Sequence, residues 1–115
     1  MDEKLLAAMA DAMVNEVHPE EIVLFGSHAR GDARSGSDFD FLVVLPDSEE
    51  TLRHRRHITG KLYRSLSAYP VAKDILVYTR AEVDHWRRVS GHVVATGLLE
   101  GRRLYARQQT VAGIR

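Results

Sequence analysis

Gly26-Ser27-His28-Ala29-Arg30-Gly31 and, shortly after it, Ser37-Asp38-Phe39-Asp40 lie between two apolar runs of the chain. The first run is residues 22–25 and the second is residues 41–45, and each has the length and composition of a β-strand. We therefore predict a strand, a glycine turn, a short helix and a second strand that carries two acids at its start. The rest of the chain is interpreted outward from this unit.

The two acids and the turn point to one kind of chemistry. Successive strand residues face opposite ways, so Asp38 and Asp40, two positions apart, project from the same face. The Gly26-Ser27 turn opens a helix whose free N–H groups form an anion site. Metal-assisted phosphoryl transfer needs a phosphate cradle beside paired carboxylates. The stretch therefore predicts phosphoryl chemistry.

The same residues carry a family resemblance. Gly-Ser followed by Asp-x-Asp resembles the signature of the DNA polymerase β-type nucleotidyltransferases. The fuller form, Gly-Ser-x-Ala-Arg-Gly and then Ser-Asp-x-Asp, resembles the minimal nucleotidyltransferases (MNT), which in many prokaryotes are the antitoxins of HEPN-domain ribonuclease toxins. The resemblance covers nearly the whole chain, to about Tyr105, and implies a truncated nucleotidyltransferase palm.

Size and composition fit one small domain. The chain has 115 residues, of which 44% are hydrophobic and 28% charged, and its formal net charge is zero. A neutral chain is not a bulk binder of nucleic acid or anionic membranes, so we expect no direct nucleic-acid binding and no membrane association. It has no cysteine, which excludes disulfides and thiolate chemistry. The acidic N-terminus is no signal peptide and no apolar run reaches roughly 18 residues, so we expect a cytoplasmic protein.

The order of predicted elements gives the fold class. We expect an α+β fold of mixed α/β character, with helices packed on one small mixed β-sheet. The domain should span residues 1–106, with a flexible tail at 107–115. Asp47 is the expected cap of the third helix, and Thr79 with Glu82 forms a capping box for the fourth. The predicted elements are helix 2–17, strand 21–25, helix 28–34, strand 38–45, helix 47–67, strand 71–78, a helix from 79 past Trp86, helix 90–100 and an edge strand near 103–105.

A third carboxylate is expected on the strand at 71–78. Two divalent metals in a phosphoryl-transfer site need more than two acids to hold and bridge both ions. Asp74 is the one acid in this otherwise apolar run, which we take for a central strand where a lone acid is costly to bury. Alone, it is as readily a turn or cap residue. The resemblance places the family's third metal ligand here, so Asp38, Asp40 and Asp74 are the expected catalytic, metal-binding set.

Four further residues are expected to bind the nucleotide. Gly26 has no Cβ and lets phosphates approach the backbone, and Ser27 offers its hydroxyl and N–H. Arg30, one helical turn on, can reach phosphate or form a structural ion pair. Ser37 belongs to the same motif, and the resemblance implies that it lies at the nucleotide. The basic residues at 53–57 are expected to form a solvated face.

The resemblance also implies an activity and a partner. It implies an enzyme that uses two Mg²⁺ ions and ATP and transfers AMP to a tyrosine hydroxyl of a partner HEPN toxin, within a hetero-oligomer. Two alternatives stay open: an antitoxin that neutralises the toxin by binding alone, and a small-molecule nucleotidyltransferase of the aminoglycoside type. Intact acids disfavour the first, and the missing acceptor domain disfavours the second.

Overall fold

The computed structural model describes residues 3–107. Most of the expected tail, 107–115, therefore lies outside the described residues. No helix within the described range is long and apolar enough to cross a membrane. The elements in chain order are α1 (Glu3–Val17), β1 (Glu21–Phe25), α2 (Ser27–Arg30), β2 (Phe39–Leu45), α3 (Glu49–Ser65), β3 (Lys73–Thr79), α4 (Arg80–Trp86), α5 (Val93–Glu100) and β4 (Arg102–Ala106).

The strands form one mixed sheet, as the sequence predicted. Within the described residues its order is β3-β2-β1-β4. β1 pairs antiparallel with both β2 and β4, whereas β2 and β3 are parallel. The crossover between the parallel strands is α3, in keeping with the need of parallel strands for a long connection. The α+β, mixed-sheet prediction is confirmed.

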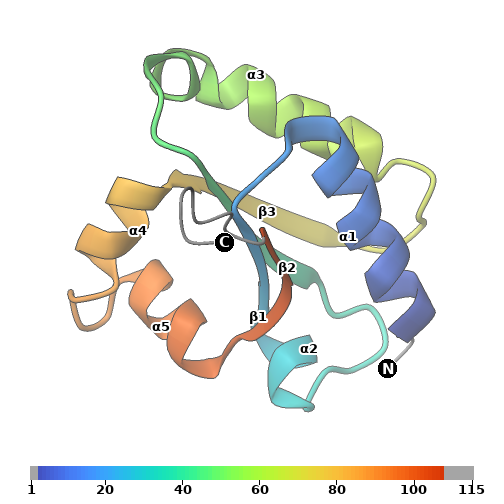
Figure 1. The fold of residues 1–115 in the computed structure, drawn as a ribbon. Coiled ribbons are helices and arrows are strands. Elements are labelled where there is room, and N and C mark those ends of the chain that lie inside the picture. The colour runs from blue at the N-terminus through green and yellow to red at the C-terminus, as the bar shows by residue number, and fades with distance from the viewer. Residues whose placement is uncertain (1–2, 108–115) are drawn as a thin grey trace, which may run out of the picture.

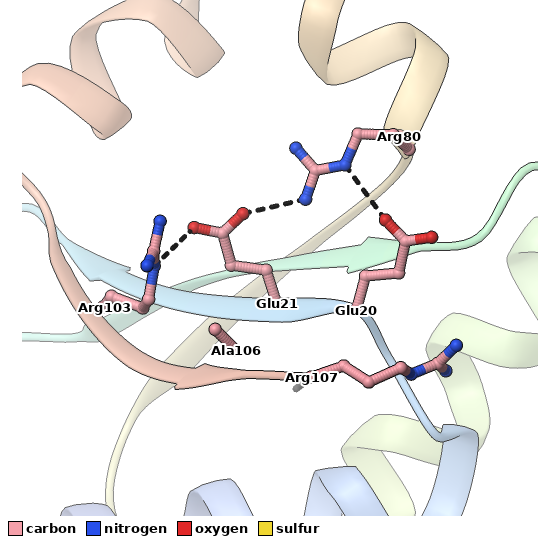
Figure 2. A pocket seen from close by; sticks show the side chains of 6 residues that line it. All are labelled: Glu20, Glu21, Arg80, Arg103, Ala106 and Arg107. Carbon is pink, nitrogen blue, oxygen red and sulfur yellow. Dashed lines mark hydrogen bonds and ion pairs between the residues drawn. The ribbon is translucent and has the colours of Figure 1, made fainter. Parts of the chain in front are cut away.

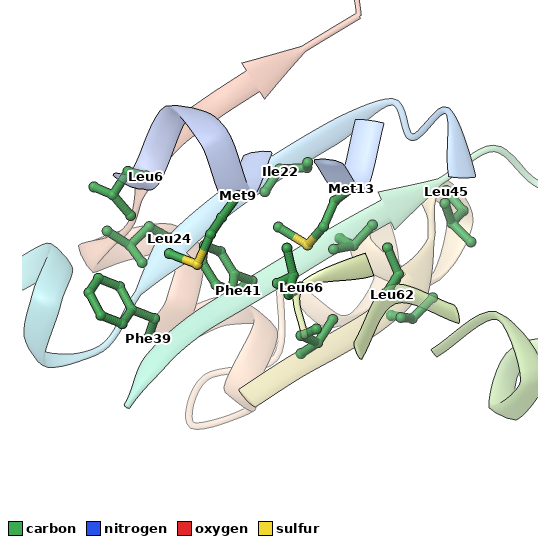
Figure 3. Close-up of a cluster of buried hydrophobic side chains, with 13 residues drawn as sticks. Leu6, Met9, Met13, Ile22, Leu24, Phe39, Phe41, Leu45, Leu62 and Leu66 are labelled. Atoms are coloured by element: carbon green, nitrogen blue, oxygen red, sulfur yellow. The ribbon is translucent and has the colours of Figure 1, made fainter. Parts of the chain in front are cut away.

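One face of the sheet is covered by α1 and α3. Strand residues alternate between faces, and Phe41 and Ile22 are among those that point to this side, where both are fully buried. Figure 3 shows this first core, in which side chains of both helices meet the strands. Its buried members are Leu6, Met9, Met13, Ile22, Leu24, Phe39, Phe41, Val43, Leu45, Leu62, Leu66, Ile75 and Val77.

The other face is covered by α4 and α5 (Figure 1), with a smaller core of Val23, Leu42, Val44, Val83 and Val94. α5 approaches β1 closely because its C-terminal end carries glycine. A Cβ at Gly101 would lie 2.5 Å from Val23 Cγ1 and 2.3 Å from Gly97 O. This close approach brings the last residue of α5, Glu100, to the end of β1.

The capping residues agree with the prediction for α4 and correct it for α3 and α5. Thr79 and Glu82 form the expected capping box. The cap of α3 is Ser48 rather than Asp47, because the Ser48 hydroxyl accepts from Thr51 N at 3.1 Å. Asp47 instead accepts from Ala81 N at 2.9 Å and so stabilises the start of α4. α5 begins at residue 93 rather than 90 because His92 caps it.

β3 lies at the edge of the sheet, so the expectation of a central strand is wrong. Two side chains of α3 cover its outward backbone groups, which protects the edge from pairing with another chain. Tyr63 Oη accepts from Ile75 N at 2.9 Å, and Arg55 donates to Val77 O at 3.0 Å. Arg55 also binds Glu82 through two nitrogens at 2.8 and 2.7 Å. Arg55 therefore does not belong to the expected solvated basic face, because its guanidinium group binds Val77 O and Glu82.

We predict that Phe41→Ala destabilises the protein far more than Leu52→Ala. Phe41 is fully buried between α1, α3 and the sheet, whereas Leu52 is 57% exposed. Truncating a buried phenylalanine costs about 3–5 kcal/mol, and a surface substitution usually stays within about 0.5 kcal/mol. Urea unfolding at pH 7 measures both. Equal losses for the two variants would contradict the packing of the first core.

Candidate functional site

The parallel pairing of β2 and β3 brings two of the three predicted acids together. Asp40 and Asp74 are direct partners in the register, and Phe25, just before the glycine turn, is opposite Asp40 on the other side. Neighbouring strands lie about 4.8 Å apart, so the two carboxylates occupy adjacent positions on one face. Asp38 immediately precedes β2. One end of the sheet therefore carries all three acids.

The acids are exposed to different degrees. Asp40 is half-buried, whereas Asp38 and Asp74 are exposed. The exposure of Asp74 follows from its place at the start of an edge strand, so the burial cost expected for a central strand does not arise. The burial argument that singled out Asp74 is therefore wrong, and its role as a metal ligand stays a prediction.

Asp40 is the acid under electrostatic stress. Burial raises the pKa of Asp40, and the negative charges of Asp74 and then Asp38 raise it further. The positive charges of His28 and Arg30 act in the opposite direction without cancelling the rise. The free protein thus holds an acid whose ionised form is disfavoured and would be favoured by a nearby cation.

The chemistry of the donors fits a hard divalent cation. Carboxylate oxygens are the protein ligands preferred by Mg²⁺. Within residues 3–107, no three Asp, Glu, His or Cys side chains stand close enough to hold a metal ion between them. The acids share one end of the sheet, but their side chains do not form a closed cage, and Mg²⁺ at such sites usually keeps several waters and substrate phosphates as further ligands.

Gly26 is required by the acid beside it. Its φ is +74°, in the region that favours glycine, and a Cβ there would lie 2.2 Å from Asp40 Oδ2. The sequence predicted space for a phosphate at this position. The structure shows that the space first accommodates the Asp40 carboxylate, so any side chain at position 26 would displace the acid.

The turn leads into a helix shorter than predicted. α2 ends at Arg30 because Gly31 adopts a left-handed conformation with φ +86° and donates its N–H to Ser27 O at 3.0 Å. The expected continuation to residue 34 is wrong. Among the described residues the Ser27 hydroxyl has no hydrogen-bond partner. It is half-buried at the start of α2, where it is free to donate to a ligand.

An acid from α5 already occupies the N–H of the glycine turn. Glu100 Oε1 accepts from Gly26 N at 3.2 Å and from Arg30 at 3.1 Å. Arg30 also contacts Asp32 at 3.3 Å. Of the two predicted roles of Arg30, the structure therefore shows the ion pair. Sequence reasoning missed Glu100 because it lies 74 residues from Gly26 and no local pattern distinguishes it from other surface acids.

The loop between α2 and β2 is closed by Ser37 and His28. The Ser37 hydroxyl accepts from Arg34 N at 2.8 Å. His28 Nε2 donates to Ser37 O at 3.1 Å, and its ring stacks on Phe39 with centroids 3.7 Å apart. In this structure the Ser37 side chain stabilises the loop that presents Asp38. Its role at a nucleotide stays a prediction.

A pocket of about 600 Å³ lies at the opposite end of β1 from the acids. Figure 2 shows that its charged side chains mostly bind one another. Arg80 contacts Glu20 and Glu21 at 3.0 and 2.8 Å, and Arg103 contacts Glu21 at 3.0 Å. Burial alone would raise the pKa of Glu21, but the two guanidinium groups outweigh it and lower that pKa. We interpret this network as structural, because its charges already satisfy one another.

The family follows from a direct match. Residues 6–109 match the family described as Nucleotidyltransferase domain. The chain belongs to this family. The match spans the glycine turn and both of the strands after it, β2 and β3, that carry Asp40 and Asp74, so the motif and the fold now point to the same chemistry. No curated protein sequence matches the chain.

Solved structures share the fold. A chain from a toxin–antitoxin complex with AMP-PNP is 22% identical, with a TM-score of 0.56, and the match covers 89% of this nucleotidyltransferase and 74% of that chain. A chain from the complex of a tri-AMPylated Shewanella oneidensis HEPN toxin with its MNT antitoxin is 18% identical, with a TM-score of 0.55 and coverage of 93% and 74%. A putative nucleotidyltransferase from Sulfolobus solfataricus is 26% identical, with a TM-score of 0.53 and coverage of 71% and 70%.

We predict that Asp40→Asn stabilises the metal-free protein at neutral pH. The folded-state pKa of Asp40 lies above its unfolded value, about 3.9 for an ordinary Asp. Its protonation therefore adds to the free energy of unfolding, and this contribution is complete below that pH. That contribution is lost as the pH rises through the folded pKa. Asparagine, neutral throughout, should therefore melt at a higher temperature than wild type at pH 7 in EDTA, with a difference that shrinks towards pH 4.

The control for this measurement is Asp11→Asn, which removes one acid from the exposed side of α1. It separates the effect of the acid site from that of net charge. A marked loss of melting temperature in Asp40→Asn would show that Asp40 is held by stabilising hydrogen bonds and would contradict the electrostatic account.

Proposed function

We propose that this nucleotidyltransferase is an Mg²⁺-dependent antitoxin that transfers AMP from ATP to a tyrosine hydroxyl of a partner HEPN-domain ribonuclease toxin. The observation that carries the proposal is the register that pairs Asp40 with Asp74 beside the Gly26 turn. Acids at this spacing, next to a glycine turn with a free serine hydroxyl, are suited to hold cations and a triphosphate together.

Each residue has a stated role in the proposed reaction. Asp38 and Asp40 would hold Mg²⁺, and Asp74 would share in holding a second ion. Bound Mg²⁺ would neutralise the triphosphate and lower the pKa of the acceptor hydroxyl. Ser27 donates its hydroxyl to the terminal phosphates, and Asp74 accepts the proton of the attacking hydroxyl. The tyrosine oxygen bonds to the α-phosphorus as the bond to pyrophosphate breaks.

A protein acceptor fits the part of the chain that the structure describes. The described residues form the catalytic sheet and the helices packed on it, without a further layer that would bind a small acceptor. An acceptor that brings its own binding surface overcomes this lack. Two of the structural neighbours come from toxin–antitoxin complexes, one of them with an AMPylated HEPN toxin. These neighbours support a toxin as the partner and favour it over an aminoglycoside.

We expect the double variant Asp38→Ala with Asp40→Ala to lose AMP transfer but still bind the partner. The acids lie at one end of the sheet, whereas affinity for a protein is spread over a larger surface. Transfer should fall about a thousandfold or more, which corresponds to about 4 kcal/mol of lost charge stabilisation. Mass spectrometry of a co-expressed HEPN-domain partner measures AMP addition, and co-purification measures the complex.

Asp11→Ala is the matched control, because it removes an acid from the far face of α1. The binding-only alternative predicts the opposite result in the same experiment. Should the double variant neutralise the toxin fully while wild type never modifies it, the chain acts as a cap and the enzymatic proposal fails.

A second expectation concerns Glu100, whose carboxylate shares the Gly26 N–H with the proposed phosphate. Glu100→Gln removes a negative charge there and ends the ion pair of Arg30 with Glu100, while the pair with Asp32 remains. Two like charges about 4 Å apart repel by about 1 kcal/mol in water, so ATP with Mg²⁺ should bind roughly fivefold more tightly. Calorimetry compares it with Glu49→Gln on exposed α3. Unchanged or weaker binding would place the phosphates away from this turn.

A further inference from the structure

Tyr63 makes two hydrogen bonds at the start of β3 that no part of the proposed reaction uses. Its Oη accepts from Ile75 N at 2.9 Å and donates to Asp74 Oδ1 at 3.3 Å. The side chain comes from α3, which lies on the face of the sheet opposite α4 and α5 (Figure 1). The two bonds therefore tie the outer edge of the sheet to one of the proposed metal ligands.

The geometry fixes the direction of the hydroxyl proton. A tyrosine hydroxyl has one proton, and an amide N–H can only donate. Because Ile75 N donates to Oη, the proton of Tyr63 is left for the carboxylate. The neighbouring Leu62 is fully buried in the first core, which anchors this turn of α3 against the sheet. Tyr63 itself is 38% exposed, so its hydroxyl sits at the boundary of core and solvent.

Asp74 depends on this donor for its orientation. It is exposed, and among residues 3–107 the Tyr63 hydroxyl is the one hydrogen-bond partner of its carboxylate, through Oδ1. Oδ2 is left without a protein partner in the same range. A lysine or arginine would cancel the charge of a carboxylate, whereas a neutral donor such as a tyrosine hydroxyl orients the carboxylate and leaves its charge in place. The free oxygen thus keeps its full attraction for a cation.

We propose that Tyr63 is a positioning residue that orients Asp74, holding one oxygen so that the other faces the cation. This inference rests on the proposed function, because it assigns Tyr63 a role through a proposed metal ligand. Partners of metal ligands outside the coordination sphere commonly change metal affinity or activity by about 10- to 100-fold when they are replaced. The role is specific to the hydroxyl, since the ring remains in Tyr63→Phe.

The test is an Mg²⁺ titration of ATP binding by calorimetry in wild type and Tyr63→Phe. We expect the variant to need about 10- to 100-fold more Mg²⁺ for half-saturation. Tyr69→Phe is the matched control, because its ring packs against the first core and its hydroxyl has no hydrogen bond within the described residues. Melting temperatures of the three proteins show whether the fold is retained.

A double-mutant cycle with Asp74→Asn separates positioning from general destabilisation. If Tyr63 acts through Asp74, Tyr63→Phe should cause no further loss in the Asp74→Asn background. An additive loss of Mg²⁺-dependent ATP binding overturns the inference, and so does a Tyr63→Phe titration identical to that of wild type. In either case the proposed function stands as long as wild type needs Mg²⁺ to bind ATP. A wild type that binds ATP equally well in EDTA overturns both.

Discussion

Asp40 and Asp74 face each other across a parallel strand pair, and the fold cannot separate their charges because the register sets their distance. The neighbourhood is arranged around this repulsion. Gly26 leaves room for the Asp40 carboxylate, and Tyr63 binds Asp74 without neutralising it. The unfavourable charge is kept at one end of the sheet, where cations and a triphosphate would turn it into a source of binding energy.

The repulsion between these acids is offset by the rest of the structure, where apolar side chains are buried and buried polar groups are hydrogen-bonded. The first core buries most of one face, and no buried side-chain nitrogen or oxygen lacks a hydrogen bond among the described residues. At the far end of β1, Glu21 is neutralised by Arg80 and Arg103. The acid at this end of the sheet is therefore neutralised, whereas the acids at the other end repel one another. Glu21 is neutralised by two arginines, whereas Asp38, Asp40 and Asp74 form no ion pair among the described residues.

The contact between Glu100 and Gly26 links the last helix to the proposed nucleotide site. It joins residues 74 positions apart and depends on the close approach that Gly101 permits. A carboxylate on a backbone N–H at a turn uses the same interaction as a phosphate would. In the proposed antitoxin Glu100 would therefore compete with a phosphate for that N–H, and the position of α5 would affect nucleotide binding.

The sequence by itself determined the family, the mixed sheet, the order of elements and the glycine turn beside Asp38 and Asp40, because strand periodicity, capping residues and a spaced motif are local signals. It placed Asp74 on the right strand but not at the edge, since strand order depends on pairing over long separations. Ser48 replaced Asp47 as a cap because both residues have the required chemistry. Tyr63 and Glu100 became visible only in the tertiary structure, because each meets its partner through packing of distant elements, and no local pattern encodes that meeting.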